Sequence, residues 1–457
     1  MKCIEDEIPF ELPEGWAWCR LNSIVDVRDG THDTPTYVDK GIPLITSKNL
    51  VEGGIDYSNV KYISEKDAIS INERSGVNIG DILFAMIGTI GNPSMVTKDI
   101  LISIKNVALF KFTFSKNLSN HFVMYFLDYA QEDMKNKPSG GLQPFVSLNF
   151  LRTYLVPVPP VEEQQRIVSI LADSINKIRN IDVLKNELTA SVKKAKSKIL
   201  DLAIRGKLVP QDPNDEPASV LLERIRAEKE ELINQGKIKR DKKESVIFKG
   251  DDNSYYEKIE GEVSCIDEEI PYDIPDTWTW MRLENCCVKE IRRGKSPKYA
   301  EISNVIVFAQ KCNTKYNGID ISLAQYLDET TIKRYPTDEH MQDGDIVINS
   351  TGTGTLGRVG IYKNTDNTTG LLIVPDSHVT VIRSFRCISS HYLYAFMKAH
   401  QTELEKKGEG STNQKELKPL TLKEMLIAVP PLSEQKRIDK SINVAFSHLA
   451  IIEKCLT

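Results

Sequence analysis

Apolar residues recur every three or four positions along residues 161–204. This spacing predicts a long amphipathic helix with the narrow apolar stripe of a coiled-coil seam. At 1.5 Å per residue such a helix is about 66 Å long, and Gly206 stands where it would end. The seam positions are Ile167, Leu171, Ile175, Ile178, Ile181, Leu184, Leu188, Val192, Ala195, Ile199 and Leu202.

Short apolar runs interrupted by Gly, Asn and Pro predict strands on both sides of this helix. Two of them are residues 81–86 (DILFAM) and 345–349 (DIVIN). Short helices are expected near residues 122–127 and 392–397. Each of these mixed regions ends at a Pro-Pro pair, after which a helix can begin.

A second, charged helix is predicted from Ala218 to Ile233. One interpretation packs it with the first helix as a two-helix hairpin inside a single core. A pair of antiparallel helices that joins two repeats is better supported, because a helix begins after the Pro-Pro pair at the same point of each repeat.

The chain contains a long internal repeat. Residues 7–21 (EIPFELPEGWAWCRL) return as residues 269–283 (EIPYDIPDTWTWMRL), and all four Trp of the chain lie in this pair. A repeat with an offset of about 262–271 residues indicates duplicated domains and not a solenoid. Further matched segments are 80–83 with 344–347, 121–126 with 391–396, and 158–167 with 429–438.

Composition changes this picture little. The chain has 457 residues, a formal net charge of −5 and 40% hydrophobic residues, which is typical of a folded protein with two to four domains. Residues 161–250 are net basic between acidic domains, so DNA binding would depend on local basic patches. We expect no secretion signal, no transmembrane helix, and scattered reduced thiols in a cytoplasmic protein.

Catalytic motifs are not convincing. Residues 352–357 (GTGTLG) match a dinucleotide-binding pattern, but a strand-like run follows them where a helix would be required. A turn between two strands is the better interpretation. No complete methyltransferase, nuclease, nucleophile-elbow or zinc-ligand pattern is found, so we expect a chain that performs no chemistry of its own.

Several of these stretches together resemble the specificity subunits of type I restriction–modification systems. The resemblance covers nearly the whole chain and is strong because its parts occupy corresponding places in two repeats. It is carried by residues 206–218 (GKLVPQDPNDEPA) with 221–225 (LLERI), the junctions 159–167 and 430–438, the opening 12–18 (LPEGWAW), and 29–35 (DGTHDTP).

The resemblance implies an α+β, pseudo-twofold fold in which long antiparallel coiled-coil helices separate two duplicated target-recognition domains. The expected segments are a first recognition domain (1–160), a central helical spacer (161–250), a second recognition domain (251–430) and a short distal helical region (431–457). Because the distal region is short, we expect it to pair with only part of the first helix, which would weaken docking of one partner subunit.

The resemblance also implies function. Each recognition domain would read one half of a split, asymmetric site in double-stranded DNA, and the helices would act as a ruler for the unread spacer. Two modification (methyltransferase) subunits and a restriction/translocase subunit would assemble on this scaffold. The chain itself would bind no cofactor or metal, whereas S-adenosylmethionine, ATP and Mg would belong to the partners. Alternatives are the recognition part of a related restriction enzyme and a coiled-coil adaptor that binds only proteins.

Candidate DNA-contacting residues are side chains that offer forked hydrogen bonds or positive charge in the variable loops. The strongest patch is 292–298 (RRGKSPK), because its four cations stand out within an acidic domain. The candidates are Arg28, Thr31, His32, Lys48, Asn49 and Gln143 in the first domain, and Arg292, Arg293, Lys295, Lys298, Lys311, Asn313, Arg358, Asn413, Gln414 and Lys415 in the second.

Overall fold

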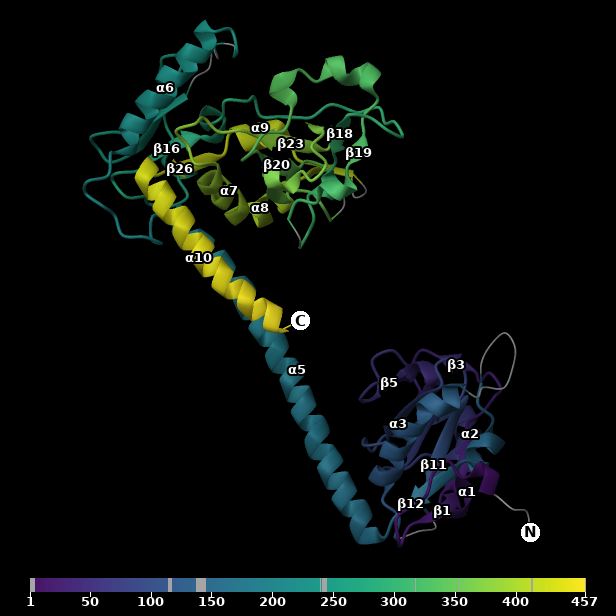
Figure 1. Ribbon diagram of the computed structural model, residues 1–457. Helices are drawn as coiled ribbons and strands as arrows, with labels where there is room; N and C mark the ends of the chain where they lie inside the picture. Colours follow the sequence, from purple (N-terminus) through teal and green to yellow (C-terminus); the bar gives the residue numbers. More distant parts are fainter. Residues whose placement is uncertain are drawn as a thin grey trace. The chain divides into compact units, whose positions relative to one another are not determined.

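The computed structural model describes residues 5–113, 117–136, 145–238, 240, 245–316, 318–352, 354–411 and 414–456. The chain divides into two compact units, Met1–Val183 and Leu184–Thr457. Both units contain a four-stranded antiparallel sheet and a second sheet with a parallel strand pair, and in both a helix begins directly after a Pro-Pro pair (Figure 1).

The first unit is built on an antiparallel sheet with strand order β2-β11-β8-β9. A second sheet, β10-β4-β7-β3, contains the parallel pair β4 and β10. The strands are β1 (Ala17–Arg20), β2 (Asp26–Asp29), β3 (Tyr37–Val38), β4 (Ile42–Thr46), β5 (Leu50–Val51), β6 (Gly54–Ile55), β7 (Lys61–Ile63), β8 (Ile82–Ala85), β9 (Gly91–Met95), β10 (Ser103–Lys105), β11 (Val107–Lys111) and β12 (Leu155–Val158). The helices are α1 (Leu21–Ile24), α2 (Glu65–Ser75), α3 (Asn120–Asn136), α4 (Leu148–Thr153) and the start of α5 (Val161–Ile204).

The second unit repeats this plan with the sheets β17-β23-β20-β21 and β19-β18-β22. It adds a three-stranded sheet, β13-β14-β15, and the hairpin β24-β25. Its strands are β13 (Ser245–Lys249), β14 (Tyr255–Ile259), β15 (Glu262–Cys265), β16 (Thr279–Arg282), β17 (Arg292–Arg293), β18 (Val305–Phe308), β19 (Gln325–Tyr326), β20 (Ile346–Asn349), β21 (Val359–Ile361), β22 (Leu372–Pro375), β23 (Val379–Ile382), β24 (Glu409–Ser411), β25 (Gln414–Glu416) and β26 (Leu426–Val429). Its helices are the end of α5, α6 (Ala218–Asn234), α7 (Ser390–Ala399), α8 (Gln401–Lys406), α9 (Pro419–Lys423) and α10 (Leu432–Leu456).

The central sheet of each unit is buried on both faces, which explains why its strands are continuous apolar runs. In β8, Ile82 and Phe84 belong to the core that contains α3, whereas Leu83 and Ala85 belong to the core shared with β4 and β10. In β20, Ile346 and its neighbour Val347 likewise enter two different cores.

Most predicted elements are found. The long helix spans Val161–Ile204, and residues 352–357 lie between the antiparallel strands β20 and β21, as expected of a turn. The helix expected at 122–127 is longer than predicted, because α3 runs from Asn120 to Asn136. The predicted domain boundary at residue 250 falls inside the β13–β14 hairpin.

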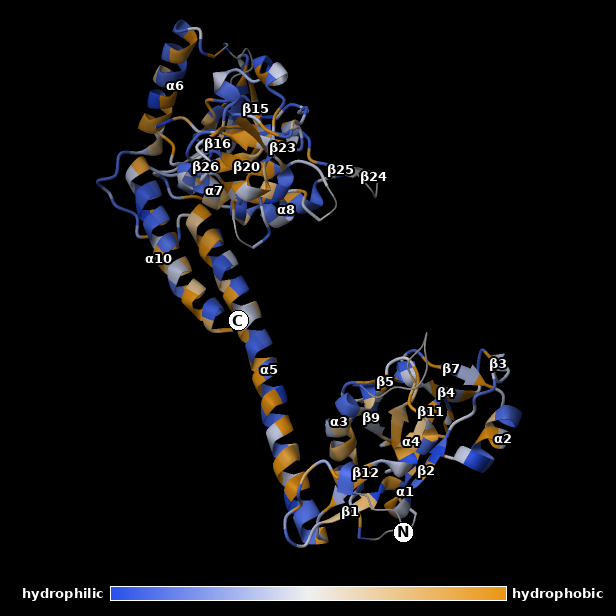
Figure 2. Ribbon diagram, turned by 45° about the vertical axis from the view of Figure 1, so that its right-hand side comes forward, coloured by the Kyte–Doolittle hydropathy of each residue, from blue (hydrophilic) through white to orange (hydrophobic). Residues whose placement is uncertain are grey.

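The antiparallel pair is formed by α10 and the end of α5, within the second unit. Lys196 of α5 forms an ion pair with Glu453 of α10 at 2.6 Å and lies over the Phe446 ring. Ile204 shares a core with Ile438, near the start of α10, so the two helices run in opposite directions (Figure 2). Helix α6 instead packs on β13 and β16 through Leu222 and Ile225, so the hairpin alternative was wrong.

Each unit holds its helix with the same buried glutamine. Gln164 is 2% exposed; its side-chain oxygen accepts a hydrogen bond from the Ser119 backbone N–H at 2.8 Å, and its Nε2 donates to the Pro159 carbonyl at 3.0 Å. In the second unit, Gln435 binds the Ser389 N–H and the Pro430 carbonyl in the same way. This side chain therefore ties the first turn of the helix to the helix α3 or α7 of its own domain.

A tryptophan reinforces each junction. Trp16 Nε1 donates to Glu163 at 3.1 Å, and Trp278 Nε1 donates to Glu434 at 2.9 Å. The carboxylates also lie in the first helical turn, where the helix dipole favours negative charge. The matched EIP…W…W segment and the Pro-Pro-x-x-Glu-Gln segment of the repeat are thus two halves of one contact.

We predict that Gln164→Ala lowers the free energy of unfolding of the first unit by about 2–3 kcal/mol, because it leaves buried backbone groups without partners. Denaturant unfolding followed by tryptophan fluorescence measures this change. Gln165→Ala is the matched control, since Gln165 is exposed, and it should change stability by less than about 0.5 kcal/mol. Equal effects of the two substitutions would contradict the junction as described.

Candidate functional site

A glycine brings two chain segments into close contact at the same place in both units. A Cβ on Gly30 would lie 2.3 Å from the Ile104 carbonyl oxygen, and one on Gly294 would lie 2.4 Å from the carbonyl oxygens of Pro375 and Asp376. Only glycine permits this approach. As a result Thr31 pairs with Lys105, and Lys295 pairs with Asp376, at the carboxyl ends of parallel strands.

In the first unit, several polar side chains lie around the close approach at Gly30. We call them the first polar edge: Thr31, His32, Lys48, Arg74, Lys105 and Asn106. Arg74 binds Asp29, and Lys105 Nζ donates to Thr34 Oγ1 at 2.9 Å. The Ser47 hydroxyl donates to the Asn106 carbonyl, which places exposed Lys48 beside the same turn. Arg74 and Lys105 were missed in the sequence, because Arg74 lies in α2, far along the chain from Asp29.

Both ring nitrogens of His32 lie within hydrogen-bond distance of side-chain oxygens. Its Nδ1 lies 3.0 Å from Asn106 Oδ1, and its Nε2 lies 2.9 Å from Asp29 Oδ2. Only the protonated ring donates from both nitrogens. The pKa of His32 is therefore raised above its ordinary value, first by the Asn106 hydrogen bond and then by Asp29.

Two other first-domain candidates have internal roles. Arg28 donates to Asp26 and to the Arg74 carbonyl, each at 2.8 Å. Asn49 is 5% exposed; its oxygen accepts from Thr46, and its amide donates to two backbone carbonyls. Asn49 is thus unavailable to a base edge, which corrects its assignment as a reading residue. Gln143 lies outside the described residues.

The basic patch of the second unit is largely neutralised by its own acids. Arg292 binds Glu339, a carboxylate that is 3% exposed, and Lys295 lies 3.9 Å from the same carboxylate. Arg293 pairs with Glu416 at 2.9 Å, and Lys298 pairs with Asp328 at 2.8 Å. The four cations are therefore oriented side chains and do not form a free positive surface.

The remaining second-domain candidates divide into two groups. Lys311 lies in the turn after β18 as Lys48 does after β4, and both are exposed without an ion pair among the described residues. Asn313 is 1% exposed and donates to Asn349 and to the Arg358 carbonyl. Arg358 donates back to the Asn313 carbonyl, so both residues support the 350–358 turn. This corrects the assignment of Asn313 to a base.

The hairpin β24-β25 places Gln414 and exposed Lys415 near the patch. Glu416 follows Lys415, pairs with Arg293 and forms a backbone bridge with Thr351. Asn413 lies outside the described residues. The Arg293–Glu416 pair thus joins the hairpin to the patch. We group their cations with Lys311 of the turn after β18 as the second polar edge: Arg293, Lys295, Lys298, Lys311 and Lys415.

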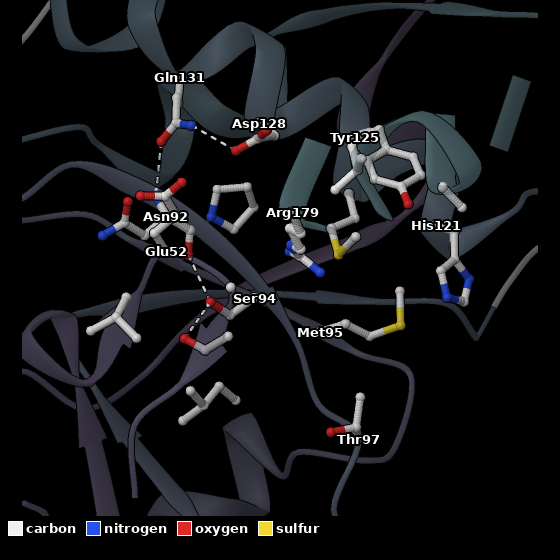
Figure 3. Close-up of a pocket in the computed structure, with 18 of the residues that line it drawn as sticks. Glu52, Asn92, Ser94, Met95, Thr97, His121, Tyr125, Asp128, Gln131 and Arg179 are labelled. Atoms are coloured by element: carbon white, nitrogen blue, oxygen red, sulfur yellow. Dashed lines mark hydrogen bonds between the residues drawn. The ribbon is translucent and has the colours of Figure 1, made fainter. Parts of the chain in front are cut away.

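A groove of about 980 Å³ lies in the first unit between β9, α3 and residues 172–182 of α5 (Figure 3). Gln131 organises its floor by accepting from the Asn92 N–H and donating to Asp128. Its cations are balanced by equal numbers of carboxylates, which does not favour a phosphate backbone. None of the candidate DNA residues that the structure describes lines this groove. Its charged residues are Lys98, Lys135, Arg179, Glu52, Asp128 and Asp182.

The family model for the type I restriction modification DNA specificity domain matches this chain twice, over residues 13–190 and 275–454. These two matches contain the two polar edges and both helix junctions. The chain belongs to this specificity family.

Relatives agree with this membership. The EcoAI specificity subunit of Escherichia coli is 34% identical over 54% of this chain and 38% of its own length. The EcoEI specificity subunit of the same organism is 24% identical over 98% of this chain and 80% of its own length. The alignment with EcoAI thus covers well under half of that relative.

Solved structures agree in fold. An HsdS subunit from Thermoanaerobacter tengcongensis superposes with a TM-score of 0.55 at 19% identity, covering 99% of this chain and 94% of that one. A chain from a study of complex assembly and conformational transition of the type I R-M system gives a TM-score of 0.60 at 18% identity, covering 98% of this chain and 94% of that one.

Within the described part of this specificity chain, no helix is long and apolar enough to cross a membrane, and no group of three His, Cys, Asp or Glu residues is placed to hold a metal.

We predict that His32 titrates above the ordinary histidine pKa and that Asn106→Gly moves it back down. Glycine keeps the left-handed backbone of residue 106, whose φ is 56°, while removing the acceptor. Because the folded pKa is raised, the stability that protonation contributes is full at low pH and is lost as pH rises through that pKa. NMR titration of labelled histidine measures it, with the unsubstituted chain recorded under the same conditions as the reference. An unchanged His32 titration in Asn106→Gly would refute the assigned hydrogen bond.

Proposed function

We propose that this specificity subunit reads a split, asymmetric site in double-stranded DNA, with one half-site for each unit. The observation that carries the proposal is the close approach of two chain segments at Gly30 and again at Gly294. In both copies of the fold, a polar edge with several cations lies at this contact. A duplicated reader fits a bipartite site, since each copy contacts its own bases.

The proposal assigns this chain no catalytic step. Two methyltransferase subunits and a restriction/translocase subunit would assemble on it, and S-adenosylmethionine, ATP and Mg would act in those partners. The helices would set the length of the unread spacer, since α5 has 44 residues and is about 66 Å long. Purified chain given these cofactors and DNA should therefore form no methylated or cleaved product.

The cations of the two polar edges can be assigned either to base edges or to phosphates. The partner of Arg292, Glu339, is buried and also binds buried Lys289 at 2.7 Å, so moving the guanidinium to a base would disrupt a buried network of charges. The partner of Arg293, Glu416, is about half exposed and can be released to water. We therefore assign a base edge to Arg293, whose planar fork suits guanine, and phosphates to Lys48, Lys295 and Lys311.

Exchanging residues 270–425 for the matching domain of a relative tests the proposed reading directly. We expect one half of the methylated motif to change and the other half to stay, because each unit has its own cores and its own polar edge. Methylation mapping in cells that express the modification partners gives the result. A folded, active exchange variant with an unaltered motif, or with both halves altered, would refute modular reading.

We predict that Lys48→Ala and Lys311→Ala each weaken binding to cognate and unrelated duplexes by the same factor. Each should also reduce the slope of log affinity against log salt by about one, because one phosphate contact releases about one counterion. Fluorescence anisotropy over a salt series measures both quantities on the assembled complex. Lys436→Ala, at an exposed position on α10, is the control and should leave the slope unchanged. A loss confined to the cognate sequence would instead assign these lysines to bases.

A further inference from the structure

The backbone at the end of α2 is held by two cations of the neighbouring sheet. Arg28 of β2 donates to the Arg74 carbonyl at 2.8 Å, and Lys111 of β11 donates to the Gly76 carbonyl at 2.7 Å. Both contacts end on main-chain atoms. They therefore fix the path of the chain here, whatever side chain stands at position 74.

The second unit contains the same arrangement 264 positions later, at the offset that also relates Gly80 to Gly344. There Arg383, directly after β23, donates to the Asp338 carbonyl at 3.1 Å and to the His340 carbonyl at 2.7 Å. The same two carbonyls are thus held in both copies of the fold.

Each holding cation at the second carbonyl is fixed in turn by a buried acid. Lys111 Nζ lies 2.7 Å from Asp81, and Arg383 forms two hydrogen bonds to Asp345, each of 2.7 Å. Asp81 is 5% exposed and Asp345 is fully buried, and breaking a buried ion pair is costly. These contacts therefore belong to the fold that the two units share and not to what either unit recognises.

The side chain that this backbone presents differs between the units. The Arg74 side chain is 62% exposed, and its counterpart Asp338 is an exposed carboxylate. The next position is buried in both units, where Ser75 is 1% and Glu339 is 3% exposed, so the two segments are in the same register. A position with a backbone fixed by the fold and an exposed side chain of opposite charge in two copies is suited to set what each copy binds.

Arg74 is an oriented hydrogen-bond donor at the first polar edge. Its Nη2 donates to the Asp29 carboxylate and, at 3.2 Å, to the Gly30 carbonyl. All of its hydrogen bonds within the described residues use Nη2, which leaves the N–H groups of Nη1 and Nε open to a ligand. The contact to Asp29 thus orders the guanidinium without using its full donor capacity.

No other arginine that the structure describes in the first unit offers such a group to the first polar edge. Arg28 uses Nε and Nη2 on an acid of its own strand and Nη1 on the end of α2. Arg20 and Arg152 donate to other backbone carbonyls. Arg166 and Arg179 belong to α5 and not to the polar edge.

We propose that Arg74 reads a guanine in the half-site of the first unit and that Asp29 positions it, an inference that rests on the proposed function. Guanine presents two acceptors, N7 and O6, in the major groove, whereas adenine presents a donor beside its single acceptor. With Nη2 held by Asp29, the open N–H groups of Arg74 donate to the two guanine acceptors. Adenine is disfavoured, because its amino group meets a cation that can only donate.

Arg74→Lys tests this reading on the assembled complex. Lysine keeps the positive charge and can still pair with Asp29, but it lacks the planar set of donors. Methylation mapping in cells that express the modification partners should show one guanine position relaxed, in the half-site that persists when residues 270–425 are exchanged. In anisotropy measurements, affinity for the cognate duplex should fall about tenfold, and affinity for an unrelated duplex should change less than about twofold.

Lys66→Ala is the matched control, because Lys66 is an exposed cation in the first turn of the same helix. It should leave the methylated motif unaltered and the cognate affinity within about twofold, since an exposed charge away from the contact is screened by salt. Arg74→Ala should relax the same guanine position as Arg74→Lys.

Equal weakening of cognate and unrelated duplexes by Arg74→Ala, with Arg74→Lys close to the unsubstituted chain, would make Arg74 a phosphate contact and overturn the inference. A bipartite motif that both Arg74 variants leave unaltered would overturn it as well, while the proposed function stands. An unsubstituted complex that methylates no bipartite motif would instead overturn the proposed function, and this inference with it.

Discussion

The buried glutamine at each helix start is the contact on which the rest of each unit depends. Gln164 and Gln435 fix the first helical turn to backbone groups of their own domain, and a Trp–Glu hydrogen bond closes the same junction. A helix of about 66 Å magnifies any error at its base: a tilt of about 10° displaces its far end by about 11 Å. A helix that sets the spacer, as proposed, would therefore need a junction without free rotation.

Periodicity predicted the parts of the fold that obey local rules. The bounds of α5 follow from a sustained apolar repeat between a Pro-Pro pair and Gly206, and β8 and β20 follow from fully buried apolar runs. The hairpins β13-β14-β15 were missed, because their exposed residues alternate little and their central contact, Arg282 with Glu257, joins distant segments. The local pattern of apolar and polar residues does not show which separated segments pair with each other.

The polar edges could be predicted only in part. Residue type suggested Asn49 and Asn313, yet both amides hold backbone turns inside the protein. Arg74 was not suggested, although it binds Asp29 across 45 positions of sequence. Whether an asparagine faces solvent or its own backbone depends on how distant loops meet, and a single sequence does not contain that information. Gly30 and Gly294, for which the sequence analysis predicted no role, mark the close approach of these loops in the structure.

Pairing the four cations of residues 292–298 with acids would change how a chain of net negative charge recognises DNA under the proposed function. A free arginine must be ordered when it binds, which costs side-chain entropy. Arg293 and Lys298 are already ordered by Glu416 and Asp328, so under the proposed function a duplex that replaced those carboxylates would meet a preformed geometry. An unrelated duplex would gain the same charge attraction but would not satisfy the same fork. The acids would therefore reduce general attraction to phosphate while preserving the difference between right and wrong bases, and that difference is what sequence specificity requires.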